Sequence, residues 1–145
     1  MHEVTHQVMD DYLQFMPTWL IEGTAEYTEM LPDTANGFLS RQNESGMKDY
    51  IKQGDKRLGS VEIPNLEEHM TMTRDKWQSL TGTSSSMFTP YFRSCLIVYY
   101  FNHLDDDGKG TRFMKYMDAL YDEVSAMREF FKNPAVKRTP DGRFS

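Results

Sequence analysis

The chain has one cysteine in 145 residues, no long apolar run and no cluster of basic residues. Because Cys95 is alone, an intrachain disulfide framework is excluded, and its place in the apolar segment SCLIVYYF predicts a small buried side chain. No segment approaches the roughly 18 uninterrupted apolar residues that a membrane helix needs, so no membrane-spanning segment is predicted. The net charge is −6 and Lys and Arg are scattered, which argues against nucleic acid as a partner.

The composition is that of a folded protein. Apolar residues make up 39% of the chain, aromatic residues 13% and charged residues 26%, which together favour a packed core over a disordered segment. The length predicts a single domain that covers residues 1–145.

The spacing of apolar residues predicts a mostly α fold. It predicts a helix over residues 2–15, ended by Pro17, and a second helix from there to Met30. The segment 33–64 is rich in Gly, Asn, Ser and Lys, and it predicts a loop with one short helix at residues 47–53.

The second half of the chain is also predicted to be helical. Residues 63–80 suggest short helical turns, and PYFRSCLIVYYFNHL predicts a buried helix entered at Pro90. A turn at DDDGKG leads into a last amphipathic helix over residues 111–131. Its apolar stripe consists of Phe113, Met117, Leu120, Val124, Met127 and Phe131.

The segment HEVTH at residues 2–6 has the pattern of a metal site. Residues four apart lie on one face of a helix, so the imidazoles of His2 and His6 can bind one metal ion. Glu3, about 100° round the helix from His2, points beside that ion, where a general base belongs. A catalytic zinc ion takes three protein ligands and leaves one position for water, so a third ligand is required.

The segment WLIEGTAEYTEM offers that ligand. Glu22, Glu26 and Glu29 form an acidic stripe on one helical face, and a short loop can turn that face towards the histidines. Glu22 is the candidate third ligand. Glu26, one turn on, can accept a hydrogen bond from the non-ligating nitrogen of a histidine and so orient its ring. The alternative is that the stripe is an ordinary solvated surface.

These motifs carry a family resemblance. HEVTH followed by PTWLIEGTAEYTE resembles the gluzincin metallopeptidases, the clan of thermolysin and the zinc aminopeptidases, over roughly residues 2 to 120. The resemblance implies a helical subdomain of a gluzincin-type enzyme that binds Zn²⁺ through His2, His6 and Glu22. It also implies that Glu3 is the general base.

Tyr91 is a further candidate catalytic residue. It matches the position where the aminopeptidases place a tyrosine that stabilises the oxyanion. This chain has Arg93, Ser94 and Cys95 where those enzymes continue with Lys-Gly-Ala. The alternative is that Tyr91 caps a buried helix with its hydroxyl at the surface. His69 and His103 have no ligand partners at useful spacing and are predicted to lie at the surface or at helix ends.

The resemblance implies a zinc-dependent peptidase that acts on a peptide or protein substrate. In gluzincins the histidine-bearing helix follows a β-sheet, so the chain is expected to be the C-terminal, helical half of a larger catalytic domain, secreted or in the cell envelope. The alternative is a catalytically silent binding or structural module of such a protein. Glu3 favours the peptidase, since a purely structural zinc site needs no base beside the metal.

Overall fold

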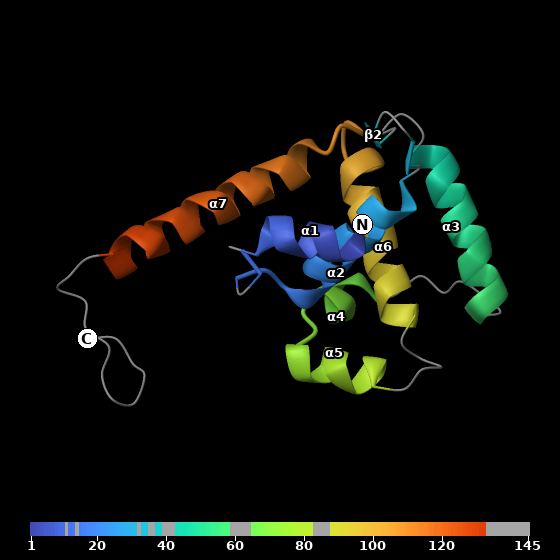
Figure 1. Cartoon of the computed structure of the whole chain (residues 1–145), viewed down its shortest axis with the longest axis horizontal. Helices are drawn as coiled ribbons and strands as arrows, with labels where there is room; N and C mark the ends of the chain where they lie inside the picture. The colour runs from blue at the N-terminus through green and yellow to red at the C-terminus, as the bar shows by residue number, and fades with distance from the viewer. Residues whose placement is uncertain are drawn as a thin grey trace. The chain divides into compact units, whose positions relative to one another are not determined.

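The structure, a computed structural model, describes residues 1–10, 12–13, 15–31, 33–34, 37–38, 43–58, 65–82 and 88–132. It is mostly helical, as predicted, and separates into two compact units, Met1–Phe101 and Asn102–Ser145 (Figure 1). The helices are α1 (His2–Met9), α2 (Thr18–Met30), α3 (Asn43–Leu58), α4 (Leu66–Met70), α5 (Arg74–Thr81), α6 (Phe88–His103) and α7 (Thr111–Lys132). None of the described helices has the length and apolar character needed to cross a membrane.

Two very short strands follow α2. β1 (Asp33–Thr34) pairs with β2 (Gly37–Phe38) in an antiparallel register, Asp33 opposite Phe38 and Thr34 opposite Gly37. They lie in a segment that was predicted to be loop, and they form no larger sheet within the described part of the chain.

The first helix is shorter than the apolar spacing predicts. α1 ends at Met9, and the chain continues in turns, in which the backbone N–H groups of Tyr12 and Leu13 donate to the Met9 carbonyl at 2.7 and 3.2 Å. The predicted helix over residues 2–15 was therefore too long, because half-buried turn residues extended its apolar pattern. Pro17 is the N-cap of α2 with φ −65°, where its missing N–H costs nothing.

The third helix is longer than the predicted segment 47–53. α3 contains two ion pairs one turn apart, Glu44 with Lys48 at 2.6 Å and Asp49 with Lys52 at 3.2 Å, which favour the helical form. Its full length was not predicted, because the sequence is polar and only a few of its residues are buried.

The core of the first unit forms between α2 and α6. Its most deeply buried side chains include Leu20 and Ala25 of α2 and Phe92, Cys95 and Val98 of α6. The predicted burial of Cys95 is confirmed, and burial is also the main cause that raises the pKa of its thiol.

Gly23 lets α2 approach α6 closely. A Cβ atom at this position would lie 2.6 Å from the carbonyl oxygen of Ser94 and 2.9 Å from a methyl carbon of Val98. These distances are too short for any side chain, and the backbone oxygen cannot move aside as a flexible side chain would. The Glu-Gly pair in the motif therefore has a packing reason: the glycine allows the contact that places its neighbour Glu22.

His69 was predicted to lie at the surface or at a helix end. It lies in the last turn of α4, but its side chain is buried. Its Nε2 lies 2.8 Å from the hydroxyl of Ser94, and its ring meets the edge of Trp77. Burial, and then the charge of Arg93, lower the pKa of His69. No local pattern predicts this contact, since Ser94 follows 25 residues later. His103 is the last residue of α6, at a helix end as predicted.

The second unit contains the predicted turn and the last helix. Asp106, Gly108 and Gly110 have positive φ angles, and the Asp107 carboxylate accepts hydrogen bonds from the Lys109 N–H and the Thr111 hydroxyl. Along α7 the predicted apolar stripe is the less exposed side, with Val124 at 1% exposure. The last stripe residue, Phe131, is 44% exposed.

The close approach at Gly23 leads to the first prediction. Gly23→Ala should lower the free energy of unfolding by about 1–3 kcal/mol, because the added methyl overpacks the contact with α6. Urea denaturation followed by circular dichroism measures the change. Gly82→Ala is the matched control: Gly82 is exposed with φ −69°, so the same substitution should change stability by no more than about 0.5 kcal/mol. Equal effects of the two substitutions would contradict the packing role of Gly23.

Candidate metal centre

α1 lies against α2 and presents its histidines to that helix. None of the side chains of α1 is buried, so apolar packing does little to hold it. A hydrogen bond of 2.6 Å joins the hydroxyls of Thr5 and Thr28, and the Thr28 hydroxyl also lies 2.8 Å from the carbonyl of Ala25. Polar contacts therefore position α1.

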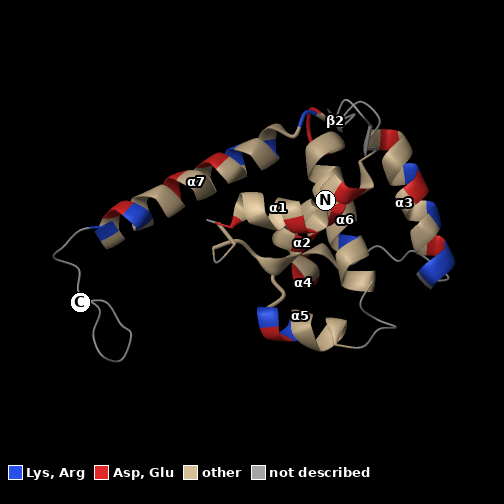
Figure 2. Cartoon of the chain, viewed as in Figure 1, with Lys and Arg blue, Asp and Glu red and all other residues tan. Residues whose placement is uncertain are grey.

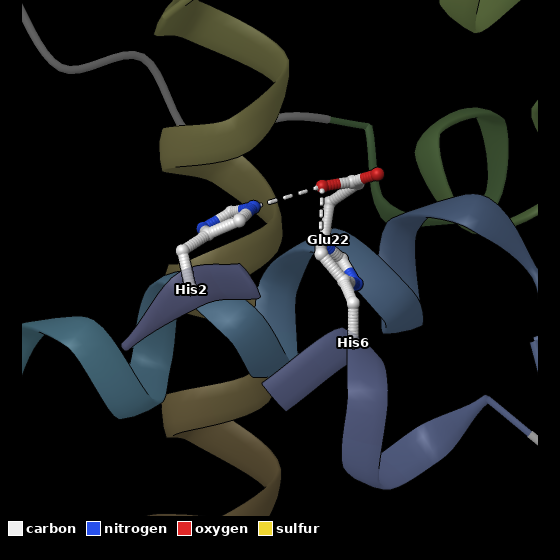
Figure 3. A group of neighbouring side chains, drawn as sticks. All are labelled: His2, His6 and Glu22. Atoms are coloured by element: carbon white, nitrogen blue, oxygen red, sulfur yellow. Dashed lines mark ion pairs between the residues drawn. The ribbon is translucent and has the colours of Figure 1, made fainter. Parts of the chain in front are cut away.

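The structure brings together His2, His6 and Glu22. The Nε2 atom of His2 lies 3.3 Å from Oε2 of Glu22, and the Nε2 atom of His6 lies 3.5 Å from the same oxygen. Figure 3 shows the two imidazoles from α1 turned towards the Glu22 carboxylate from α2. The two rings meet edge to face with centroids 4.7 Å apart. The three predicted ligand atoms thus face one small volume.

These three donors fit the coordination of a zinc ion. Zinc binds imidazole nitrogen and carboxylate oxygen at about 2.0–2.1 Å in a tetrahedral arrangement, which separates neighbouring donor atoms by about 3.3–3.4 Å. The two nitrogen–oxygen distances of 3.3 and 3.5 Å are close to that separation. All three donor atoms lie within 4.8 Å of one another. Two imidazoles and one carboxylate also form a ligand set typical of catalytic zinc.

The centre is accessible to solvent. The side chains of His2, His6 and Glu22 are 21%, 20% and 18% exposed. A structural zinc site is closed, whereas a catalytic site keeps a position for water or substrate. Partial exposure of all three side chains is consistent with the second kind of site.

Glu26 and Glu29 lie on the other side of His2. Its Nδ1 atom is 3.5 Å from Oε1 of Glu26 and 3.5 Å from Oε2 of Glu29. The Tyr50 hydroxyl donates a 2.6 Å hydrogen bond to Oε2 of Glu26, so the two oxygens of that carboxylate have different neighbours. Glu26 therefore lies where it was predicted to orient a histidine. Burial is the main cause that raises the pKa of Tyr50, which keeps its hydroxyl a donor.

A second group of donors competes with the first. His2, Glu26 and Glu29 also come within 4.8 Å of one another. This group contains one histidine where the first has two, and one of its carboxylates already accepts a hydrogen bond from Tyr50. The first group matches the coordination of zinc better, because it offers two imidazoles, and Glu22 has no comparable hydrogen bond among the contacts of the described residues.

Tyr91 and Glu3 lie at the edge of this centre. The centroid of the Tyr91 ring lies 6.3 Å from that of His2 and 5.4 Å from that of Trp77, with which it forms an edge-to-face pair. Burial, followed by the charge of Glu22, raises the pKa of Tyr91, and the charges of Glu26 and Glu3 act in the same direction. The phenol therefore stays protonated at neutral pH and can donate a hydrogen bond. Glu3 is exposed on α1 next to His2.

Tyr50, Glu29 and Trp77 were not predicted to take part. Tyr50 lies in the short helix that was predicted at residues 47–53, but no pattern in the sequence pointed to its hydrogen bond with Glu26. Glu29 belonged to the acidic stripe, and its spacing from Glu26 could have suggested that it faces the same histidine. Trp77 comes close only through the packing of α5, which the sequence pattern does not encode.

The second prediction concerns the ligands. His2→Ala, His6→Ala and Glu22→Ala should each remove most of the bound zinc, because three protein ligands are the usual minimum for a catalytic site. Zinc content after dialysis, measured by atomic absorption, tests this. Glu29→Ala is the matched control on the same helix and should keep nearly the full content. Loss of zinc in Glu29→Ala, together with its retention in Glu22→Ala, would assign the metal to the second group.

Comparisons of the chain with models of protein families, with curated proteins and with solved structures find no match. The resemblance to gluzincins therefore rests on the two sequence motifs alone.

Proposed function

We propose that this chain carries the active site of a zinc-dependent peptidase that hydrolyses a peptide bond in a peptide or protein substrate. The observation that supports this most is the convergence of His2 and His6 on one oxygen of Glu22, at 3.3 and 3.5 Å. A carboxylate that immediately follows the first histidine, Glu3, adds the base that hydrolysis requires.

His2, His6 and Glu22 would hold the ion. When bound, zinc lowers the pKa of water to about 7 and polarises a carbonyl group. Glu26 would keep the His2 ring in place from the Nδ1 side, which leaves Nε2 free to bind the metal.

The remaining residues of the site transfer the proton of the attacking water and stabilise the negative charge that develops on the carbonyl oxygen. Glu3 accepts a proton from the attacking water and then delivers it to the amine that leaves. The Tyr91 hydroxyl donates a hydrogen bond to the carbonyl oxygen as negative charge develops on it. Because Tyr91 belongs to α6 and Glu3 to α1, the substrate carbonyl would lie between these two helices.

The third prediction separates metal binding from chemistry. Glu3→Gln should keep its zinc but hydrolyse casein at less than about a hundredth of the parent rate, since an amide cannot accept the proton. Zinc content and the hydrolysis rate are measured on the same preparation. Glu67→Gln, the same change at an exposed position of α4, should leave both unchanged.

Two outcomes would contradict the proposal. A Glu3→Gln protein that keeps its activity would exclude Glu3 as the base. A parent protein that binds zinc but cleaves neither casein nor a random-sequence peptide library would favour the alternative function, a binding or structural module.

The fourth prediction concerns Tyr91. Tyr91→Phe should lower kcat on the order of 10²-fold with little change in KM, because the hydroxyl acts on the oxyanion more than on the bound substrate. Tyr100→Phe, on the same helix but 44% exposed, is the control and should not affect kcat. An unchanged kcat in Tyr91→Phe would leave this tyrosine with a packing role only.

A further inference from the structure

A cavity of about 450 Å³ lies between α2, α3 and the first turn of α6. Its size falls within the range of about 300–1,000 Å³ that is common for ligand pockets. The lining includes Glu26 and Glu29 of α2, Asp49, Tyr50 and Arg57 of α3, and Phe88 of α6.

The cavity adjoins the candidate metal centre. Glu26 and Glu29 line the cavity, and both also lie 3.5 Å from Nδ1 of His2. Glu26 links the two directly, because one of its oxygens faces His2 and the other accepts the hydrogen bond from Tyr50. A side chain of a substrate whose peptide bond lies at the metal centre could therefore enter this cavity.

The charge of the cavity favours a cation. Three carboxylates line it, those of Glu26, Glu29 and Asp49, against the single guanidinium of Arg57. Arg57 lies over the ring of Phe88, 4.7 Å from its centroid. Figure 2 shows that α2 carries only acidic residues among its charged ones, whereas α3 carries both signs.

Two of these carboxylates can still bind a ligand. Glu29 is 57% exposed. Asp49 is 69% exposed, and its ion pair with Lys52 is a surface pair of the kind that contributes little to stability. A ligand could therefore displace Lys52 from Asp49.

The walls also suit an aliphatic stem. Phe88 and Met30 are half-buried and offer apolar surface, and the Tyr50 ring is stacked on Phe92 with centroids 5.1 Å apart. Lysine and arginine bury their methylene groups along such surfaces while the charged end reaches polar groups. A cavity with apolar sides and a net negative lining matches both parts of these side chains.

We infer that this cavity binds a lysine or arginine side chain of the substrate, close to the bond that is cleaved. The inference rests on the proposed peptidase function, and it specifies which substrate side chain that peptidase would prefer. Glu29 and Asp49 would pair with the cation, and Phe88 and Met30 would contact the stem.

The experiment measures binding without turnover, so that it does not depend on hydrolysis. Isothermal titration calorimetry on the zinc-free protein and on the Glu3→Gln variant uses short N-acetylated peptides that differ at one position: lysine, the uncharged isostere norleucine, or glutamate. The lysine peptide should bind about tenfold more tightly than the norleucine peptide, and the glutamate peptide most weakly.

Variants of Asp49 locate the effect in the cavity. Asp49→Asn should reduce the preference for lysine about three- to tenfold, and Asp49→Lys should reverse it in favour of glutamate. Asp55→Asn is the matched control, because Asp55 lies on the same helix, is exposed and does not line the cavity. Zinc content, measured in parallel, should be the same in all three variants.

Three results would overturn the inference. One is equal affinity for the three peptides, including no measurable affinity for any of them. Another is an Asp49→Lys protein that still prefers lysine. The third is a norleucine peptide with a free amino terminus that binds as tightly as the acetylated lysine peptide, since the cavity would then recognise the terminal amine. Failure of the peptidase proposal would look different: lysine-selective binding without cleavage by the zinc-loaded protein.

Discussion

The site depends on the close approach of α2 to α6 at Gly23. A Cβ atom there would lie 2.6 Å from a backbone oxygen, so only glycine allows the contact. This contact and the buried side chains of Leu20 and Ala25 decide which face of α2 is turned inward. Glu22 precedes Gly23 and lies about 100° round the helix from it, so this orientation turns Glu22 and the rest of the acidic stripe towards α1. The position of the proposed third ligand thus follows from packing in the core and not from the ligand itself.

The carboxylates of the acidic stripe repel one another, and the histidines of α1 lie close to them. Carboxylates one turn apart on a helix repel one another by a few tenths of a kcal/mol, and α2 carries three in succession with no basic residue in its last turn. The side chains of His2 and His6 lie among them. A bound cation would remove this repulsion and would also tie α1, which has no buried side chain, to α2. Binding of the proposed metal would therefore be coupled to the order of α1.

Features with a strong local pattern could be predicted from the sequence. α2, α6 and α7 have apolar spacing and proline or glycine at their ends, and the spacing of the histidines implies one shared helical face. The length of α3 could not be predicted, because its polar sequence is held in a helix by ion pairs and by packing against α6. At Gly54 this packing is so close that a Cβ atom would lie 2.4 Å from the ring of Phe92. The burial of His69 depends on Ser94, which is distant in sequence. Pairings of this kind arise from tertiary packing and leave no local trace.

α3 contacts both the candidate metal centre and the proposed specificity pocket. Tyr50 of this helix donates to Glu26, whose other oxygen faces His2, and Asp49 of the same helix lines the cavity. The Tyr50 ring is in turn stacked on Phe92 in the core. The orientation of a proposed ligand and the charge of the proposed specificity pocket are thus set by one helix, whose own position follows from its contact with α6. A change in that contact would alter both properties together, whereas a change at Asp49, which is exposed and makes no contact with His2 among the ion pairs of the described residues, would alter the pocket alone.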